Sequence, residues 1–142
     1  MMIAIMKIKL DTGAKMPISA HEADAGYDLF ARETKVVPAR GSASFDTGVH
    51  IQIPVGYVGF LKSKSGLNVK HGIISDGTID SGYTGKIVVK LYNLSDEDYT
   101  VEAGDKITQI VFQPIEKPKF EEVEEFEETE RGNGGFGSSG RA

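Results

Sequence analysis

The sequence predicts an all-β domain, a sandwich or a barrel built from short strands. Apolar and polar residues alternate over residues 45–53, which is the two-residue period of a strand with one buried face. Turn-forming Gly and Pro residues recur about every ten residues, as they do in sandwiches and barrels. No long stretch carries the period of an amphipathic helix, and we expect at most one helical turn, after residues 65–67.

Length and composition exclude several classes of protein. The chain has 142 residues, enough for one domain with its own core. It contains no Cys, which excludes disulfides and thiolate metal sites and favours an intracellular protein. The net charge of -5 argues against general nucleic-acid binding. The apolar start, residues 1–10, is too short and too soon interrupted by Lys for a signal or a membrane span. We therefore expect a cytoplasmic protein with neither nucleic acid nor membrane as a partner.

The strand signals begin at the N-terminus. Residues 3–10 alternate loosely and predict a first strand, and residues 11–25 form a polar connection. Residues 25–31 are a short apolar run that contains Asp28. A buried carboxylate in a strand must be paired or hydrogen-bonded. Asp28 is therefore either a functional group or a structural residue that fixes its own turn.

From residue 36 onward the strand signals repeat. Residues 45–53 predict one strand and residues 57–61 another, separated by a turn containing Pro54 and Gly56. Residues 62–67 then bring together two cations, two hydroxyl groups and a Gly, which are groups that phosphate oxygens accept. The segment is not a P-loop, because the spacing and a following helix are both missing. The alternative is a solvated loop.

The stretch from residue 77 to residue 85 carries the strongest signal for chemistry. Asp80 and Tyr83 stand three residues apart in a glycine-rich turn, and an apolar strand follows over residues 87–92. Glycine permits tight turns and close approach of the backbone to a ligand. We predict a sharp hairpin that displays both side chains. The alternative is a surface hairpin in which Asp and Gly only make the turn.

The last strand signal and a polar connector follow. Residues 93–103 are polar and acidic, and residues 104–112 predict a strand entered through a turn. Gln109 lies within that apolar run, either as a satisfied core amide or as a ligand contact. Residues 116–130 are dominated by Glu, which predicts an extended, solvated connector. Its interleaved Val123 and Phe126 can dock on a neighbour.

The C-terminal segment, residues 131–142, is too rich in glycine to order itself. It nevertheless carries groups that suit a nucleotide. Arg131 offers a bidentate fork for phosphate, successive N–H groups of Gly and Ser can form an anion nest, and Phe136 offers a face for a base. The alternative is a disordered tail.

Five of these stretches, in this order, resemble the five motifs of the trimeric dUTPase family. They are residues 25–31, 64–67, 77–83 with Gly85, 104–112 and 131–140, and the third and fifth are the most specific. The resemblance implies a jelly-roll β-barrel with a flexible C-terminal arm, and a homotrimer with shared active sites. It also implies Mg²⁺-dependent hydrolysis of dUTP to dUMP and pyrophosphate. The chain then divides into a catalytic barrel (1–115), an acidic connector (116–130) and a glycine-rich lid motif (131–142).

The resemblance also implies roles for individual residues. Asp80 matches the base that activates water for in-line attack on the α-phosphate, and Tyr83 matches the ring that packs on deoxyribose and excludes a 2′-hydroxyl. Asp28 matches the acid that holds the metal through water. The resemblance further implies that the backbone of Gly77, Thr78 and Ile79 reads uracil. It implies phosphate contacts from Lys64, Ser65, Gly66 and Gln109. In the tail it implies substrate contacts from Arg131, Phe136, Gly137, Ser138 and Ser139, with Phe136 over uracil.

Two departures and two rival interpretations accompany the resemblance. Lys64 stands where Arg is usual, which keeps the charge but loses the planar fork. Ser139 stands where Thr is common, which keeps the hydroxyl. The related dCTP deaminases share the fold, but they need a Glu with polar partners that residues 77–85 do not show. A non-catalytic trimeric scaffold would need neither Asp80 nor Tyr83 nor the tail.

Overall fold

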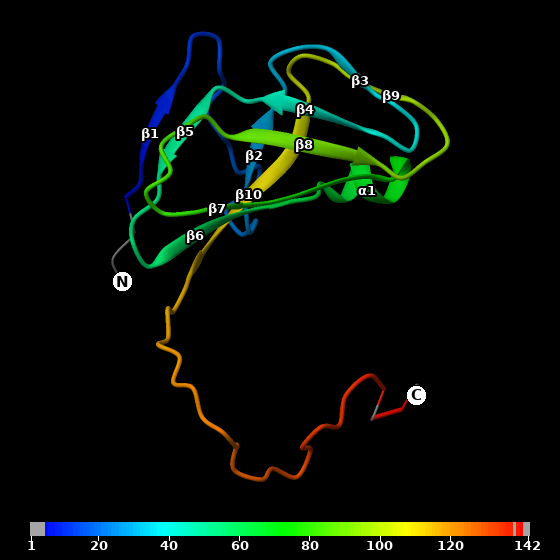
Figure 1. Cartoon of the computed structure of the whole chain (residues 1–142). Helices are drawn as coiled ribbons and strands as arrows, with labels where there is room; N and C mark the ends of the chain where they lie inside the picture. The colour runs from blue at the N-terminus through cyan, green and yellow to red at the C-terminus, as the bar shows by residue number, and fades with distance from the viewer. Residues whose placement is uncertain (1–4, 138, 141–142) are drawn as a thin grey trace.

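The computed structural model describes residues 5–137 together with residues 139 and 140. It confirms the all-β prediction, because the described part contains ten strands and a single short helix (Figure 1). The elements are β1 (Lys7–Leu10), β2 (Tyr27–Phe30), β3 (Lys35–Val37), β4 (Ser42–Asp46), β5 (Val49–Gln52), β6 (Tyr57–Lys62), α1 (Ser65–His71), β7 (Ile73–Ile79), β8 (Val88–Asn93), β9 (Tyr99–Val101) and β10 (Lys106–Pro114).

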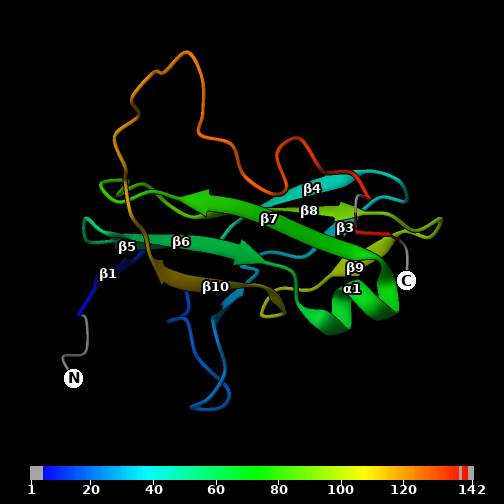
Figure 2. The ribbon, with the colours of Figure 1, turned by 90° about the horizontal axis from the view of Figure 1, so that it is seen from below.

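The strands form one large sheet and two small ones. The large sheet has six strands in the order β2-β10-β6-β7-β8-β4, and every neighbouring pair in it is antiparallel. The pairs β1-β5 and β3-β9 form the two small sheets. Figure 2 shows the sheets curling around a common interior, so that the strands enclose the core from several sides.

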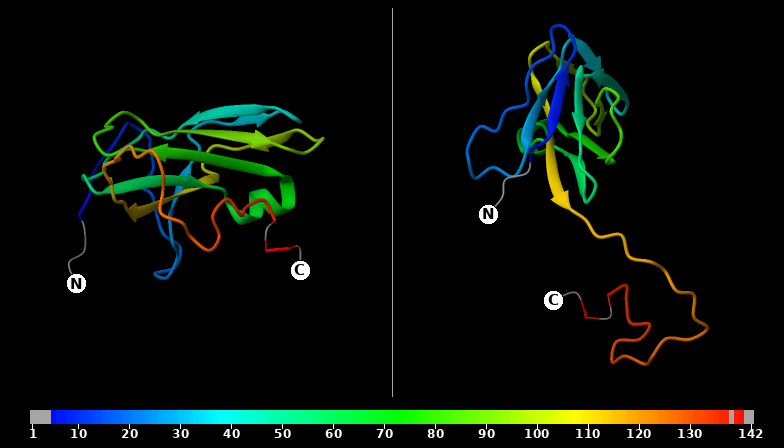
Figure 3. Two further views of the ribbon diagram at one scale, coloured as in Figure 1. Left: turned by 60° about the horizontal axis from the view of Figure 1, so that its bottom comes forward. Right: turned by 90° about the vertical axis from the view of Figure 1, so that its left-hand side faces the viewer.

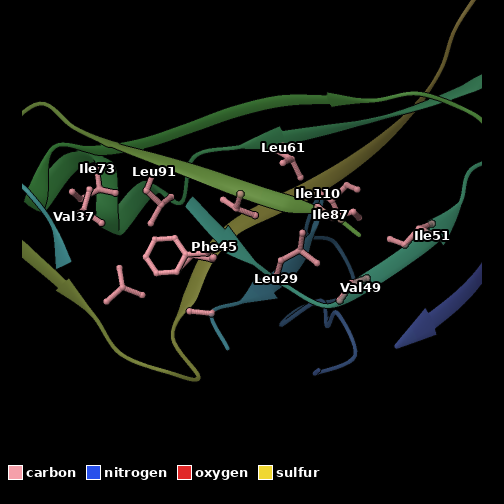
Figure 4. Close-up of a cluster of buried hydrophobic side chains, with 14 of the residues drawn as sticks. Leu29, Val37, Phe45, Val49, Ile51, Leu61, Ile73, Ile87, Leu91 and Ile110 are labelled. Atoms are coloured by element: carbon pink, nitrogen blue, oxygen red, sulfur yellow. The ribbon is translucent and has the colours of Figure 1, made fainter. Parts of the chain in front are cut away.

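Side chains from facing strands fill this interior. Leu29, Phe45, Leu91 and Ile110 are completely buried, and they come from β2, β4, β8 and β10 (Figure 4). Along β8 buried and exposed residues alternate strictly, with Val89 and Leu91 pointing inward. The two-residue alternation of apolar and polar residues therefore corresponds to a sheet with one face packed on the core, as the sequence predicts.

The predicted strand over residues 45–53 is in fact two strands. β4 ends at Asp46 and β5 begins at Val49. Between them Gly48 adopts a left-handed conformation (φ 68°), and the buried Thr47 hydroxyl donates to the Ile87 carbonyl at 2.7 Å. Inward-facing positions continue through the break, since Thr47 is as buried as Phe45 and Val49, two residues away on either side. The alternating pattern therefore hides the corner where the chain changes sheets.

The expectation of at most one helical turn is wrong. Helix α1 has 7 residues, about two turns at 3.6 residues per turn. It ends at His71 and is capped by Gly72, whose left-handed conformation (φ 68°) lets its N–H reach carbonyls of the last turn. None of its residues is buried. A helix that buries no residue leaves no apolar period in the sequence, which is why the pattern did not predict the helix that begins within residues 62–67.

After β10 the chain leaves the body as an extended segment, coloured orange to red in Figures 1 and 3. Every residue from 113 to 133 is exposed. Phe120 and Phe126 are 97% and 91% exposed, values that few large apolar side chains reach in a folded chain. Among the described residues, no helix combines the length and apolar character that crossing a bilayer requires.

Candidate active site

The loop of residues 80–87, between β7 and β8, carries Asp80 and Tyr83. It is not the sharp hairpin that the sequence predicts, because β7 pairs with β8 only at residues 73–75. Beyond that point the two strands diverge: Ile79 of β7 pairs with Gly59 of β6, whereas Val88 of β8 pairs with β4. The loop is therefore wide. Among the described residues, the edge of β7 at residues 76–79 has no strand partner on the side that β8 leaves.

Hydrogen bonds within the loop fix the position of Tyr83. The Tyr83 amide donates to the Asp80 carbonyl at 3.3 Å, and its hydroxyl donates to the Lys86 carbonyl at 2.7 Å. Gly82 has φ 88°, which only glycine adopts without strain. The Tyr83 ring is therefore held within its own loop, and the side chain still remains 46% exposed.

A surface hollow of about 220 Å³ lies at this loop. It is lined by Thr78, Ile79, Asp80, Tyr83, Lys86 and Val88. A carboxylate, an aromatic ring and the unpaired edge of a strand thus face one space. This combination suits a ligand with a flat polar edge, an apolar ring and a reacting group near the carboxylate.

A second cluster surrounds Asp28 on β2. The Asp28 side chain is only 7% exposed, and one carboxylate oxygen lies 2.5 Å from the Lys64 ammonium. The other oxygen lies 3.4 Å from the ammonium of Lys106. A buried carboxylate must be paired, and this one has two cations. Sequence reasoning did not single out Lys106; its place at the entrance of the fourth motif is the signal that could have found it.

Gln109 belongs to the same cluster through the sheet. It lies opposite Asp28 in the ladder between β10 and β2, and its side-chain amide donates to the Ser63 carbonyl at 3.1 Å. Ser63 in turn bonds with both the amide and the carbonyl of Ser75 on β7. Gln109 therefore fixes the segment that leads to Lys64 and to the exposed Ser65 and Gly66 at the start of α1.

Gly26 shows how closely β2 and β10 approach at this cluster. A Cβ atom on Gly26 would come within 2.9 Å of the Ile110 carbonyl oxygen and 3.1 Å of the Gln109 side-chain oxygen. The first distance would force backbone to move. The glycine two residues before Asp28 is therefore required for the carboxylate to lie opposite Gln109.

The two clusters lie at opposite ends of the β6-β7 pair. Lys62 faces Asp76 at one end of this ladder, and Gly59 faces Ile79 at the other. Lys64 lies beyond the first end and Asp80 beyond the second, which separates them by about 20 Å at ~3.3 Å per residue. Figures 1 and 2 show α1 and the β7-β8 loop at opposite ends of β7. One chain alone does not bring Asp80 to the Lys64 cluster.

The C-terminal residues lie away from both clusters. The Arg131 guanidinium bonds within the tail, to the Gly134 carbonyl, and Phe136 is fully exposed. Gly137 has φ 97°, and Ser139 is exposed. Ser138, also a predicted contact, lies outside the described residues. Figure 3 shows the tail at the end of the extended connector, separated from the strands in the right-hand view.

Comparison with known proteins identifies the family of the chain. The dUTPase family model matches residues 12–140. The chain belongs to the dUTPase family. It is 45% identical over 135 residues to the deoxyuridine 5′-triphosphate nucleotidohydrolase of Clostridium acetobutylicum, with 93% of each chain covered.

Solved dUTPases have the same fold. The dUTPase of Staphylococcus bacteriophage 80alpha, solved with dUpNHpp, is 36% identical with a TM-score of 0.91, over 98% of this chain and 100% of that one. A mutant dUTPase of phage phi11 is 32% identical with a TM-score of 0.80, over 87% of this chain and 99% of that one; its structure concerns the coordination of a structural Mg(II) ion. The likeness confirms the jelly-roll class predicted for this dUTPase-family chain.

The described residues of the Asp28 cluster in this dUTPase-family protein offer one carboxylate, and no protein cage, to a Mg²⁺ ion. Among the described residues, no three His, Asp or Glu side chains gather as a metal cage. Asp28 supplies hard oxygen donors, but both of its oxygens face ammonium groups. Mg²⁺ commonly keeps several waters and binds one or two carboxylates together with substrate phosphates. Because both oxygens of Asp28 already face cations, this carboxylate fits such an ion through water, with phosphate and water as the direct ligands.

Proposed function

We propose that this protein hydrolyses dUTP to dUMP and pyrophosphate. The observation that carries the proposal is the unpaired edge of β7 beside Asp80 and Tyr83. Family membership supports the nucleotide class, and the related phage 80alpha dUTPase was solved with dUpNHpp. Each part of the substrate has a counterpart among the backbone groups and side chains described above.

The edge of β7 supplies base recognition. At residues 77–79 the backbone N–H and C=O groups that β8 leaves unpaired pair with the polar edge of uracil. These groups are strong, directional partners, and their spacing is fixed by the β6-β7 ladder. Gly77 packs against Leu61, where a Cβ atom would approach a Leu61 methyl to 3.0 Å. The base therefore meets a rigid edge, which leaves no room for a methyl group at C5.

Tyr83 supplies sugar recognition. Its ring is anchored through the Lys86 carbonyl, so it presents a fixed face in the hollow. Deoxyribose packs on this face, and a 2′-hydroxyl would collide with it. A steric and desolvation clash of this kind discriminates between substrates without any direct bond to the sugar.

The second cluster supplies phosphate binding. Lys64, Ser65, Gly66 and Gln109 contact the phosphate chain, and Lys106 adds a cation that the sequence did not indicate. Ammonium and hydroxyl groups are suitable partners for phosphate oxygens. Asp28 would hold Mg²⁺ through water, and the ion, when bound, would neutralise charge on the phosphate oxygens.

Asp80 supplies the base. A water molecule attacks the α-phosphorus in line with the bridging oxygen to the β-phosphate. The Asp80 carboxylate accepts the proton of that water as the new P–O bond forms. The bond from the α-phosphorus to the bridging oxygen breaks, and pyrophosphate leaves with the electron pair. General base catalysis of this kind typically contributes about 10²–10⁴-fold.

The active sites are shared between the subunits of a homotrimer. The separation of Asp80 from Lys64 along β6 and β7 supports this part of the proposal, since a second chain is needed to join them. The C-terminal arm supports it too. Residues 117–130 reach about 45–50 Å when extended, at ~3.3–3.6 Å per residue, which spans a small domain.

The tail closes the site as a lid. Residues 1–115 form the catalytic unit, residues 116–130 the connector, and residues 131–142 the lid. Arg131, Ser138 and Ser139 contact the terminal phosphate, Gly137 provides the turn, and Phe136 stacks on uracil. A segment this rich in glycine orders only when a ligand supplies the contacts. Closure then excludes water other than the attacking molecule.

Pyrophosphate release tests the proposal directly. The purified protein is incubated with each deoxynucleoside triphosphate and with UTP, in the presence of Mg²⁺ or of EDTA. We expect pyrophosphate from dUTP alone, and only with Mg²⁺. Release of ammonia from dCTP would instead assign a deaminase. Tight binding of dUTP without turnover of any nucleotide would assign a scaffold.

A further inference from the structure

His50 on β5 connects the loop that carries Tyr83 to a distant turn of the chain. Its Nδ1 atom lies 2.8 Å from the Thr84 carbonyl oxygen, and its Nε2 atom lies 3.0 Å from a carboxylate oxygen of Asp11. The imidazole is 18% exposed. One ring thus joins the β7-β8 loop to the turn that follows β1.

Both partners of the ring are hydrogen-bond acceptors. A neutral imidazole has one N–H group, so one of these contacts would set a ring lone pair against an oxygen lone pair. Both bonds form together only in the imidazolium. The pKa of His50 is accordingly raised, first by the Thr84 carbonyl and then by Asp11, against burial and the charge of Lys9.

The charged groups around His50 come from three elements. Lys9 lies directly opposite it in the β1-β5 ladder, and Lys7 lines the same surface hollow. Lys86, on the β7-β8 loop, is paired with Asp46. Asp11 is held in place by its own turn, since its amide donates to the Gly48 carbonyl at 2.8 Å and its carbonyl accepts from Ala14. The nearest carboxylate is therefore fixed where Nε2–H needs an acceptor.

We propose that His50, as an imidazolium, is a positioning residue for the loop that presents Tyr83. It holds the Thr84 carbonyl, one residue after Tyr83, while the Tyr83 hydroxyl holds the Lys86 carbonyl two residues further on. These two bonds fasten the loop on both sides of Gly85. Deprotonation of His50 removes one of its two bonds and loosens the sugar-selecting ring. The consequence for catalysis rests on the function proposed above, whereas the coupling between His50 and the loop does not.

The coupling is tested by NMR titration, without substrate. The reporter is the Gly85 amide nitrogen, which shares a peptide group with the Thr84 carbonyl. We expect the His50 ring and the Gly85 amide to titrate with one midpoint above the ordinary histidine value of about 6.5. The Gly85 titration should vanish in His50→Gln, and the midpoint should fall in Asp11→Asn. Gly85 shifts that do not follow His50, or a midpoint at or below the ordinary value, would overturn the coupling.

The catalytic consequence is tested by kcat/KM for dUTP and UTP as a function of pH. Above the His50 midpoint, we expect the preference for dUTP to fall by about three- to tenfold, the size of one hydrogen bond. His50→Gln should show the lower preference at every pH. His71→Gln is the matched control, because that exposed ring packs on Tyr99 instead. A preference that does not change with pH while Gly85 titrates would refute the role of His50 in sugar selection. Absence of any dUTP turnover would refute the proposed function and leave the NMR result standing.

Discussion

The Tyr83 hydroxyl oxygen lies so close to Gly85 that a Cβ atom on that glycine would approach it to 2.6 Å. The same oxygen donates to the Lys86 carbonyl at 2.7 Å, so the ring occupies the space that a side chain at residue 85 would need. The missing side chain of Gly85 therefore helps to set the position of the Tyr83 ring, although the Gly85 backbone needs no left-handed conformation.

This contact predicts how sugar selection depends on Gly85. Gly85→Ala should displace the ring and lower the preference for dUTP over UTP, and Tyr83→Ala should have the same effect by removing the ring. Both variants should retain their preference for dUTP over dTTP, because the edge of β7 is untouched. The measurement is kcat/KM for the three nucleotides. Tyr92→Ala, which removes a partly exposed ring from β8, is the control. Wild-type rates for UTP or dTTP within tenfold of dUTP would contradict the pocket itself.

Asp80→Asn should lower kcat by about 10²–10⁴-fold, the usual effect of losing a general base, and leave dUTP binding largely intact. The amide keeps the size of the side chain but does not accept the proton of the attacking water. Asp76→Asn is the matched control, since it removes an exposed carboxylate from the same strand. Rapid turnover by a folded Asp80→Asn protein would remove Asp80 from the mechanism.

Truncation after Glu130 should abolish most of the activity and leave the thermal midpoint nearly unchanged. Residues 113–133, which the structure describes throughout, are all exposed, so this part of the arm contributes little to the core. Calorimetry and sedimentation report the midpoint and the assembly state. A drop of many degrees on truncation would show that the arm is structural.

Lys64→Ala should destabilise the chain by about 1–3 kcal/mol, because it removes the nearer cation from a nearly buried carboxylate. Lys106 remains at 3.4 Å and limits the effect. Lys64→Arg should restore most of the loss, since guanidinium also pairs with carboxylate. Urea denaturation of both variants gives the two values, and Lys70→Ala on the exposed face of α1 is the control. Equal stability of Lys64→Ala and the parent would show that the pair contributes nothing.

Shared sites predict complementation between two inactive proteins. Asp80→Asn chains and chains truncated after Glu130 are unfolded and refolded together, so that mixed trimers form. Some sites then combine Asp80 from a truncated chain with a tail from an Asp80→Asn chain, and activity should reappear. Each protein refolded alone is the control. Mixed trimers that are verified by mass and remain inactive would require each chain to carry its whole site.

Much of the fold could be predicted from the sequence, because the signal for a half-buried strand is local. Val89 and Leu91 alternate with Lys90 and Tyr92, and they face inward and outward as that pattern predicts. The corner at Gly48 could not be predicted, since Phe45, Thr47 and Val49 all face the core through the break. Helix α1 buries no residue, so the sequence contains no amphipathic helical period from which it could be predicted.

The site divides in the same way. The sequence indicated Asp28, but left open whether it was functional or structural; its two lysine partners lie far from it in the chain, and only the fold brings them together. The sequence also indicated Asp80 and Tyr83. It did not reveal the width of their loop. That width arises because β7 pairs with β8 only at residues 73–75 and with β6 at residues 76–79, and the sequence does not show where one pairing ends and the other begins. His50 carried no local signal at all, since its partners come from two other segments.

The unpaired edge of β7 also bears on how the protein behaves at high concentration. A bare strand edge invites a strand from another molecule, and such addition leads to aggregation. Here the exposed stretch is short, and a carboxylate stands at each end of it, Asp76 and Asp80. Two negative charges flanking the three residues 77–79 oppose the approach of an identical edge, since its own carboxylates would lie against them. Asp80, proposed above as the base for water, thus also opposes self-association. Neutralising both Asp76 and Asp80 should lower the solubility of the protein more than its thermal stability.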